Sequence, residues 1–187
     1  MNFINEATLQ KIIEGCVDKN HQSQKQLYDI YAKRMTGLCY RYCGDYEAAR
    51  DLMHDGFIKV FSSIDQYQGT GSFEGWLKKI VVNMVLDYIR KNDVLNKTVK
   101  VDSLENLAEE EQKEDEDFFD RLSIKNITDA IAQLPELART IFNMYNIDGY
   151  SIEDISNKLK MTSVAVRSQH SRAKQKLREI LRGMDFE

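Results

Sequence analysis

The stretch that decides the fold runs from Ser151 to Leu181 and reads SIEDISNKLKMTSVAVRSQHSRAKQKLREIL. Ser151 followed by Asp154 is a capping-box pattern that starts a helix, and apolar residues then recur at intervals of three and four. After the turn Lys160-Met161-Thr162, a second apolar stripe is formed by Val166, Ala173, Leu177 and Ile180. The pattern predicts a helix, a tight turn and a second helix.

The second predicted helix is basic away from its apolar stripe, where it carries Arg167, Arg172, Lys174, Lys176, Arg178 and Arg182. A helix held by its apolar face would present these cations to a polyanion, which is typical of a unit that reads duplex DNA. The alternative is an ordinary amphipathic helix whose charged outer face is only solvated. The rest of the chain favours the first interpretation.

Charge is unevenly divided along the chain, whose formal net charge is -4. Residues 101–120, VDSLENLAEEEQKEDEDFFD, hold ten acidic side chains and one basic side chain. Without this segment the Lys and Arg count falls from 26 to 25 and the Asp and Glu count from 30 to 20, so the remainder carries a net charge of +5. The chain is therefore better described as two basic domains joined by an acidic connector, and its low pI does not exclude DNA binding. Such a charge block is typical of a disordered linker.

Composition also predicts where the protein works. No apolar run approaches the roughly 20 residues that cross a bilayer, and the N-terminal residues lack the pattern of a secretory signal, so we expect a cytoplasmic protein. Cys16, Cys39 and Cys43 are odd in number and lack a C-x-x-C pair, which argues against a disulfide framework. Cys39 and Cys43 could share a metal with His54, although burial in a helix explains their spacing better. We expect neither a metal nor a cofactor.

Proline and glycine usage predicts an all-α fold, because Pro135 is the one proline and the glycines sit mostly at candidate turns. Periodicity predicts helices over about residues 6–17, 22–42, 46–63, 73–91, 124–133, 135–146, 152–159 and 163–182. Pro135 suits the first turn of its helix, where its missing N–H costs nothing. We expect two small helical domains, residues 1–95 and 123–187, joined by an acidic linker at residues 96–122.

A second candidate site lies in the segment Tyr67 to Lys91, which reads YQGTGSFEGWLKKIVVNMVLDYIRK. It joins a glycine-containing polar loop to a helix that bears aromatic rings and cations, a combination that suits single-stranded DNA because rings stack on unpaired bases while cations follow the phosphates. Asn83 offers a donor and an acceptor to a base edge. The alternative for Trp76 and its apolar neighbours is a place in the core.

Four segments, in order, resemble one family: DLMHDGFIKVF (51–61), GSFEGWLKKIVVNMVLDYIRK (71–91), LPELARTIF (134–142) and VRSQHSRAKQKLR (166–178). Together they resemble an extracytoplasmic-function (ECF) sigma factor, the minimal class of the sigma-70 family, with a region 2 bundle followed by a region 4 helix-turn-helix. The resemblance implies a promoter-specificity factor that is not an enzyme. It also implies core RNA polymerase and promoter DNA as partners, and regulation by an anti-sigma factor.

The resemblance assigns roles by position. Binding to core RNA polymerase falls on Asp51, Asp55, Lys59 and Phe61. Binding to the melted -10 element, including capture of a flipped base, falls on Tyr67, Ser72, Phe73, Trp76, Lys79, Asn83, Arg90 and Lys91. Reading of the -35 element in the major groove falls on Arg167, Ser168, Ser171 and Arg172. The acidic connector would pass close to the polymerase active centre. There its negative charge would mimic nucleic acid, or the connector would serve only as a solubilising tether.

Some residues depart from the family pattern. His54 stands where the family usually has Gln, which leaves the details of the polymerase contact open. Lys160 stands where Gly often makes the turn, and this predicts a costly left-handed backbone. Val164-Ala165 replaces a common Gly-Thr pair and removes a hydroxyl that could contact phosphate. Gln169-His170 replaces an Arg-hydrophobic pair, which predicts an unusual -35 sequence.

Two other functions fit parts of the sequence. A transcriptional regulator would use the same helix-turn-helix to bind a palindromic operator as a dimer, with the N-terminal domain sensing a ligand. A small helical metalloprotein or enzyme would use Cys39, Cys43, His54 and Asp55. The sequence contains neither a nucleotide-binding glycine loop nor H-E-x-x-H, so the second alternative has little support.

Overall fold

The computed structural model of the protein describes residues 5–91 and 123–184. Along these residues every regular element is a helix, which confirms the predicted all-α fold. The chain divides into two compact units, residues 1–88 and 89–187. The predicted acidic linker, residues 96–122, lies outside the described residues together with both of its predicted boundaries.

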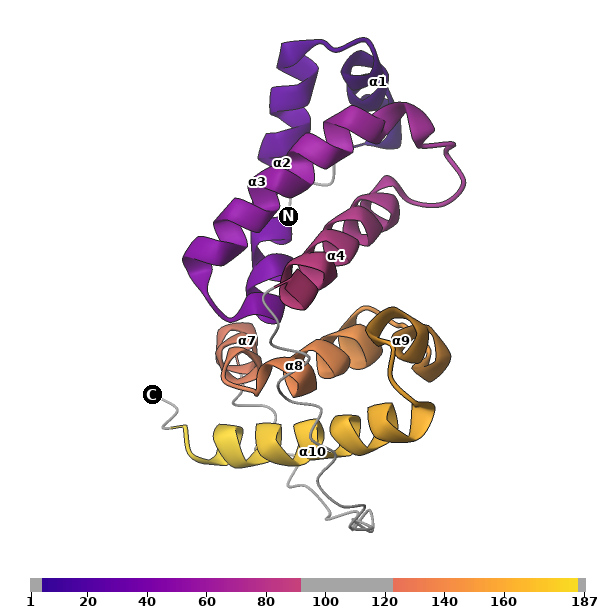
Figure 1. Ribbon diagram of the computed structural model, residues 1–187. Coiled ribbons are helices and arrows are strands. Elements are labelled where there is room, and N and C mark those ends of the chain that lie inside the picture. Colours follow the sequence, from indigo (N-terminus) through magenta and orange to yellow (C-terminus); the bar gives the residue numbers. More distant parts are fainter. Residues whose placement is uncertain (1–4, 92–122, 185–187) are drawn as a thin grey trace. The chain divides into compact units, whose positions relative to one another are not determined.

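The N-terminal unit is a series of helices joined by short turns (Figure 1). In its described part the chain forms α1 (Glu6–Val17), α2 (His21–Cys43), α3 (Tyr46–Ser63), the 3-10 turn η1 (Ile64–Gln66) and α4 (Phe73–Lys91). The side chains of Asn5, Asn20 and Asp45 cap the N-termini of α1, α2 and α3 by accepting backbone N–H groups. The α-helices begin and end within one residue of the predicted bounds, whereas η1 was not predicted.

The core of this unit lies between α2, α3 and α4, because each of these helices turns an apolar face inward. Leu27 of α2, Val60 of α3 and Leu77 of α4 are fully buried. Gly56 lets α3 approach α4 closely, since a Cβ atom at this position would lie 3.2 Å from Cγ2 of Val81. Within the described residues of this unit, α3 and α4 carry exposed side chains on the faces that point away from this core.

The C-terminal unit is built around one long helix. Its elements are α7 (Ile124–Ala132), α8 (Glu136–Phe142), the π-helical segment η2 (Asn143–Ile147), α9 (Ile152–Leu159) and α10 (Ser163–Arg182). The long helix α10 packs against α7, α8 and α9, which leaves its opposite face uncovered by them (Figure 1). The buried cluster between α10 and α7 contains Ala130, Ile131, Leu134, Leu177 and Leu181.

One predicted helix is shorter than the sequence indicates. The predicted segment covered residues 135–146, whereas α8 begins after Pro135, at Glu136, and ends at Phe142. The chain then widens into η2. Apolar periodicity does not separate an α-helical turn from a π-helical turn, because the chain coils in the same sense in both.

Candidate functional site

A capping box fixes the start of α9. The Ser151 hydroxyl oxygen accepts the backbone N–H of Asp154 (3.0 Å), and the Asp154 carboxylate accepts the backbone N–H of Ser151 (3.3 Å). The hydrogen bonds from Ser151 lower the pKa of the Asp154 carboxyl. This arrangement confirms the start of the helix-turn-helix predicted from the sequence.

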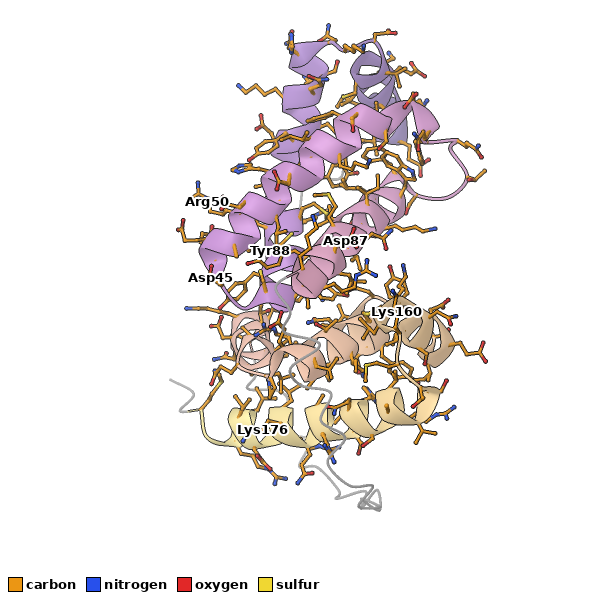
Figure 2. All side chains as sticks on the ribbon, viewed as in Figure 1. Asp45, Arg50, Asp87, Tyr88, Lys160 and Lys176 are labelled. Carbon is orange, nitrogen blue, oxygen red and sulfur yellow. The ribbon has the colours of Figure 1, made fainter. Side chains whose placement is uncertain are left out.

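The turn between α9 and α10 contains a left-handed residue. Lys160 has φ 55° and ψ 43°, which confirms the strained backbone predicted where the family often has Gly. Figure 2 labels this residue at the end of α9. Thr162 then caps α10 by accepting the N–H of Ala165 (3.2 Å), and the hydroxyls of Ser156 and Ser163 lie 3.2 Å apart across the turn. The first turn of α10 is therefore held in place by contacts on both sides.

The face of α10 opposite its core carries the side chains predicted to read the -35 element. Arg167 is exposed, whereas Ser168, Ser171 and Arg172 are half-buried. Their spacing places Ser168 and Ser171 near the centre of the outward face, with the two arginines on its flanks. The structure thus brings all four predicted residues onto the N-terminal half of one helix.

Sequence reasoning missed one residue of this face. Val164 lies in the first turn of α10 and is 58% exposed, three and four residues before Arg167 and Ser168. Its spacing of three and four residues from Arg167 and Ser168 could have identified it from the sequence. The sequence analysis considered the Val164-Ala165 pair only because it lacks a hydroxyl that could contact phosphate. Val164 therefore joins the candidate site.

His170 does not point toward the outward face. Its Nε2 atom lies 2.6 Å from Oδ1 of Asn146, and its ring centroid lies 4.6 Å from that of Tyr145. The ring also stacks on Phe142, with centroids 6.4 Å apart. This side chain therefore joins α10 to the end of α8 and to η2, and the expectation of an unusual -35 sequence stays a prediction.

The loop before α4 and the first turn of that helix form an aromatic cluster. Ring centroids lie 5.2 Å apart for Tyr67 and Phe73, 5.6 Å for Tyr67 and Trp76, and 5.5 Å for Phe73 and Trp76. Phe73 is 3% exposed, so it supports the other two rings, which remain half-buried. The cluster therefore offers Tyr67 and Trp76, rather than Phe73, to a ligand.

Glycines and hydrogen bonds shape the loop that carries Tyr67. The Tyr67 hydroxyl donates to the carbonyl of Gly71 (2.8 Å) and closes the loop. Gly69 and Gly71 have φ values of 72° and 94°, a region that other residues rarely adopt. The Ser72 hydroxyl oxygen accepts the N–H of Gly75 (3.1 Å) at the start of α4. Ser72 therefore stabilises the backbone at the start of α4 through this hydrogen bond.

The polar residues predicted for -10 binding follow Trp76 along α4. Lys79, Asn83 and Arg90 lie three, seven and fourteen residues after Trp76, so helical geometry places them on the same face. Lys79, Arg90 and Lys91 are exposed, and Asn83 is half-buried. Asp87, labelled in Figure 2, lies on this face between the cations. The face joins rings and cations as the sequence predicted.

An ion pair that the sequence analysis missed anchors the start of α4. The Glu74 carboxylate lies 2.9 Å from Nη1 of Arg34 in α2 and 2.9 Å from Nζ of Lys78. The hydrogen bond from Lys78, followed by the nearby charges, lowers the pKa of Glu74 below its usual value. Arg34 and Glu74 are far apart in sequence, so no local pattern indicates their pair, whereas Glu74 and Lys78 have the i,i+4 spacing of neighbours on a helix.

The residues predicted to bind polymerase lie along α3. Asp51, Asp55 and Lys59 are exposed on one face, whereas Phe61 is half-buried and packs against Phe57, with ring centroids 5.7 Å apart. Ile58 lies on the same exposed face and is 67% exposed, although it was not among the predicted contacts. A single exposed apolar side chain is common on protein surfaces, so Ile58 extends the exposed face of α3 without marking it as a contact by itself.

The side chain of His54, beside the exposed face of α3, contacts Tyr28 of α2. Its Nε2 atom lies 3.0 Å from the Tyr28 hydroxyl, and the two rings stack with centroids 6.1 Å apart. Tyr28 also packs against Phe57, with centroids 4.9 Å apart. The departure from Gln at this position therefore links α3 to α2.

Cys39 and Cys43 have structural surroundings that account for them. Cys39 is fully buried, and burial raises the pKa of its thiol to about 12. The Cys43 thiol donates to the carbonyl of Cys39 (2.9 Å). Among residues 5–91 and 123–184, no three His, Cys, Asp or Glu side chains lie close enough to hold a metal ion together. The predicted explanation, cysteines in a helical core, fits Cys39 and Cys43 better.

No helix in the described parts of the chain is long and apolar enough to span a membrane.

Comparison with known families identifies both units. Residues 27–94 match the model for sigma-70 region 2, and residues 124–177 match the model for sigma-70 region 4. The first match contains the α3 face and the aromatic cluster, and the second contains the helix-turn-helix. The two regions therefore occur in one chain in the order predicted from the four sequence segments.

Similar proteins agree with this assignment. The ECF RNA polymerase sigma factor SigE of Mycolicibacterium smegmatis is 31% identical over 159 residues, which cover 85% of this chain and 62% of that protein. The ECF RNA polymerase sigma factor SigW of Bacillus subtilis is 27% identical over 186 residues, which cover 96% of this chain and 100% of that protein.

A solved structure shares the fold. The sigma factor RpoE from Bartonella quintana, in complex with the anti-sigma factor NepR, aligns with a TM-score of 0.50 and 19% identity, and the alignment covers 86% of this chain and 98% of that chain. The chain belongs to the sigma-70 family of RNA polymerase sigma factors, in its extracytoplasmic-function group.

Proposed function

We propose that this protein binds core RNA polymerase and directs transcription initiation at promoters with a -35 element that it reads as duplex and a -10 element that it captures as single strand. The observation that carries this proposal is the occurrence of region 2 and region 4 in one chain. An operator-binding regulator would use the helix-turn-helix in the same way. It would not account for the match of residues 27–94 to region 2.

Duplex reading falls to α10. A recognition helix enters the major groove with its N-terminal part against the base edges, and this part of α10 carries Arg167, Ser168, Ser171 and Arg172. Arginine can donate two hydrogen bonds to guanine, and serine can donate to or accept from several bases. Lys176, further along the helix, lies 2.9 Å from Glu179, so its charge is partly neutralised. Specificity is therefore expected from the first half of the helix.

Capture of a -10 base falls to the aromatic cluster. A base that leaves the duplex loses a few kcal/mol of pairing and stacking free energy. Tyr67 and Trp76 would replace that stacking, while Phe73 supports them from below. Asn83, on the same face of α4, would contact the base edge, and Lys79, Arg90 and Lys91 would contact the phosphates. Melting is thus driven by binding, without a nucleotide cofactor.

Contact with core polymerase falls to the exposed face of α3. Asp51, Asp55 and Lys59 present charge, and Ile58 adds an apolar side chain that is 67% exposed. Phe61 supports this face through its contact with Phe57. Polymerase would hold the two units of the chain at the spacing of the promoter elements.

Three further properties belong to this proposal. The protein acts without catalysing a reaction of its own, and it works in the cytoplasm, where core polymerase meets promoter DNA. An anti-sigma factor regulates it by covering the polymerase-binding and DNA-binding faces. The similar fold of RpoE from Bartonella quintana, which was solved with an anti-sigma factor, supports this partner.

The test is run-off transcription with purified core polymerase on a promoter library. We expect transcripts from a restricted set of promoters that share -35 and -10 sequences, and weak binding to the same DNA without polymerase. Tight binding of the isolated protein, as a dimer, to a palindromic operator would contradict the proposal and support the regulator.

A further inference from the structure

Val164 gives the outward face of α10 an apolar side chain near its N-terminus. Thr162 caps the helix through the N–H of Ala165, so the cap is complete without the Val164 side chain. A β-branched residue is not favoured by helix propensity at this position, and acidic residues suit the first turn better. Val164 is nevertheless 58% exposed. Local helix stability therefore does not explain its presence.

The position of Val164 relates it to the predicted base-reading residues. Arg167, Ser168 and Ser171 follow it by three, four and seven residues, so all four share one face of α10. Side chains on a helix lean toward its N-terminus, and the N-terminal part of a recognition helix is the part that contacts base edges. Val164 would thus lie against bases when the helix occupies a major groove.

Only one base presents an apolar group in the major groove. Thymine carries a C5-methyl there, whereas the edges of the other bases offer hydrogen-bond donors and acceptors. A valine at this place cannot pair with those polar groups and would leave them without a partner. We propose that Val164 is a specificity-determining residue that contacts the 5-methyl group of a thymine in the -35 element. This inference rests on the proposed function.

The experiment removes only the methyl group. Core polymerase with the wild-type protein first selects promoters from a library randomised at the -35 element. Each thymine of the selected element, on either strand, is then replaced by deoxyuridine, and initiation is measured by run-off transcription. Loss of one buried methyl should lower initiation about fourfold at one thymine position. The other thymines should show little change.

Protein variants test whether Val164 is the residue that contacts the thymine methyl group. With Val164→Ala, initiation on the thymine template should fall to about the level seen with deoxyuridine, and the difference between the templates should largely disappear. Val164→Thr keeps a methyl at the same branch point and should retain part of that difference. Val17→Ala, which shortens an exposed valine of α1, should retain all of it.

The experiment distinguishes failure of the Val164 inference from failure of the proposed function. If initiation depends on the -35 element but thymine and deoxyuridine are equivalent at every position, or differ equally for wild type and Val164→Ala, the inference is wrong and the proposed function stands. If core polymerase and this protein initiate at no promoter, the proposed function is wrong and the inference falls with it.

Discussion

The two surfaces proposed to bind DNA are built in different ways. On α10 the candidate residues lie along one capped helix, where Arg167 is exposed and Ser168, Ser171 and Arg172 are half-buried. In the N-terminal unit the candidate rings come from a glycine-containing loop and the following helix, and Tyr67, Phe73 and Trp76 hold one another in place. A duplex offers a regular groove that a single helix can follow, whereas an unpaired base has to be enclosed from more than one side.

The largest effect is expected from the aromatic cluster, because its rings depend on one another. Trp76→Ala removes a stacking surface, worth on the order of 1 to 3 kcal/mol, and also a ring contact that supports Tyr67. Open-complex formation on duplex promoters should therefore fall by tenfold or more. Tyr67→Ala and Asn83→Ala should also impair it. Permanganate footprinting of the -10 region measures the open complex.

Controls separate base capture from folding. Tyr46→Ala removes a tyrosine of α3 that is 59% exposed and lies outside the cluster, and it should leave initiation unchanged. Helical content and polymerase binding should remain normal in all these variants. A template with a pre-melted -10 bubble should still reveal the defect, because capture is impaired as well as strand separation. Wild-type initiation by Trp76→Ala, Tyr67→Ala and Asn83→Ala on both templates would assign the cluster a purely structural role.

On α10 the effects of individual residues should be more separable. Arg167→Ala or Arg172→Ala should weaken recognition of the -35 element by roughly 1 to 3 kcal/mol if the arginine contacts a base. The loss should depend on the identity of the contacted base pair. Lys176→Ala, further along the helix, should weaken binding slightly and equally for all -35 sequences. Promoter competition assays with single base-pair changes would show the difference, and unchanged promoter use in both arginine variants would exclude them from the site.

The contrast between the two surfaces also shows which features of the fold and of the candidate sites could be predicted from the sequence. Helical periodicity and caps such as Ser151 predict elements and faces, because both depend on residues a few positions apart. The position of His170 against Asn146 and the ion pair of Glu74 with Arg34 depend on contacts between distant segments. Burial of Phe73 beneath its neighbours was hidden for the same reason. Local patterns predicted the candidate sites, and tertiary contacts decided which of their residues face outward.

A smaller effect is expected from the backbone of two turns. Lys160 and Lys19 both have positive φ, 55° and 59°, in the turns before α10 and before α2. Replacing either with Gly relieves a left-handed backbone and should stabilise the fold by about 1 kcal/mol, offset in part by the greater entropy of Gly in the unfolded chain. Urea denaturation should show higher midpoints for both variants. A lower midpoint for Lys160→Gly would mean that its side chain makes a stabilising contact.

The smallest effect concerns pH and the support of α4. The pKa of Glu74 is lowered in the folded protein, so its contribution is present above its unfolded pKa of about 4.3 and is lost as pH falls through the lower folded value. Because the pair is partly exposed, the loss should stay below about 1 kcal/mol. Glu74→Gln should remove this part of the acid dependence, as measured by urea denaturation from pH 6 to pH 3. An unchanged acid dependence would contradict the assignment.

The most direct test of the central claim compares one promoter in two forms, with core polymerase and each of two variants. The templates are a full duplex and the same sequence with a pre-melted -10 bubble and no -35 element. Arg167→Ala should reduce run-off transcription on the duplex and leave the bubble template unaffected, whereas Trp76→Ala should reduce both. Equal losses on both templates for both variants would contradict the claim that the two surfaces read separate promoter elements.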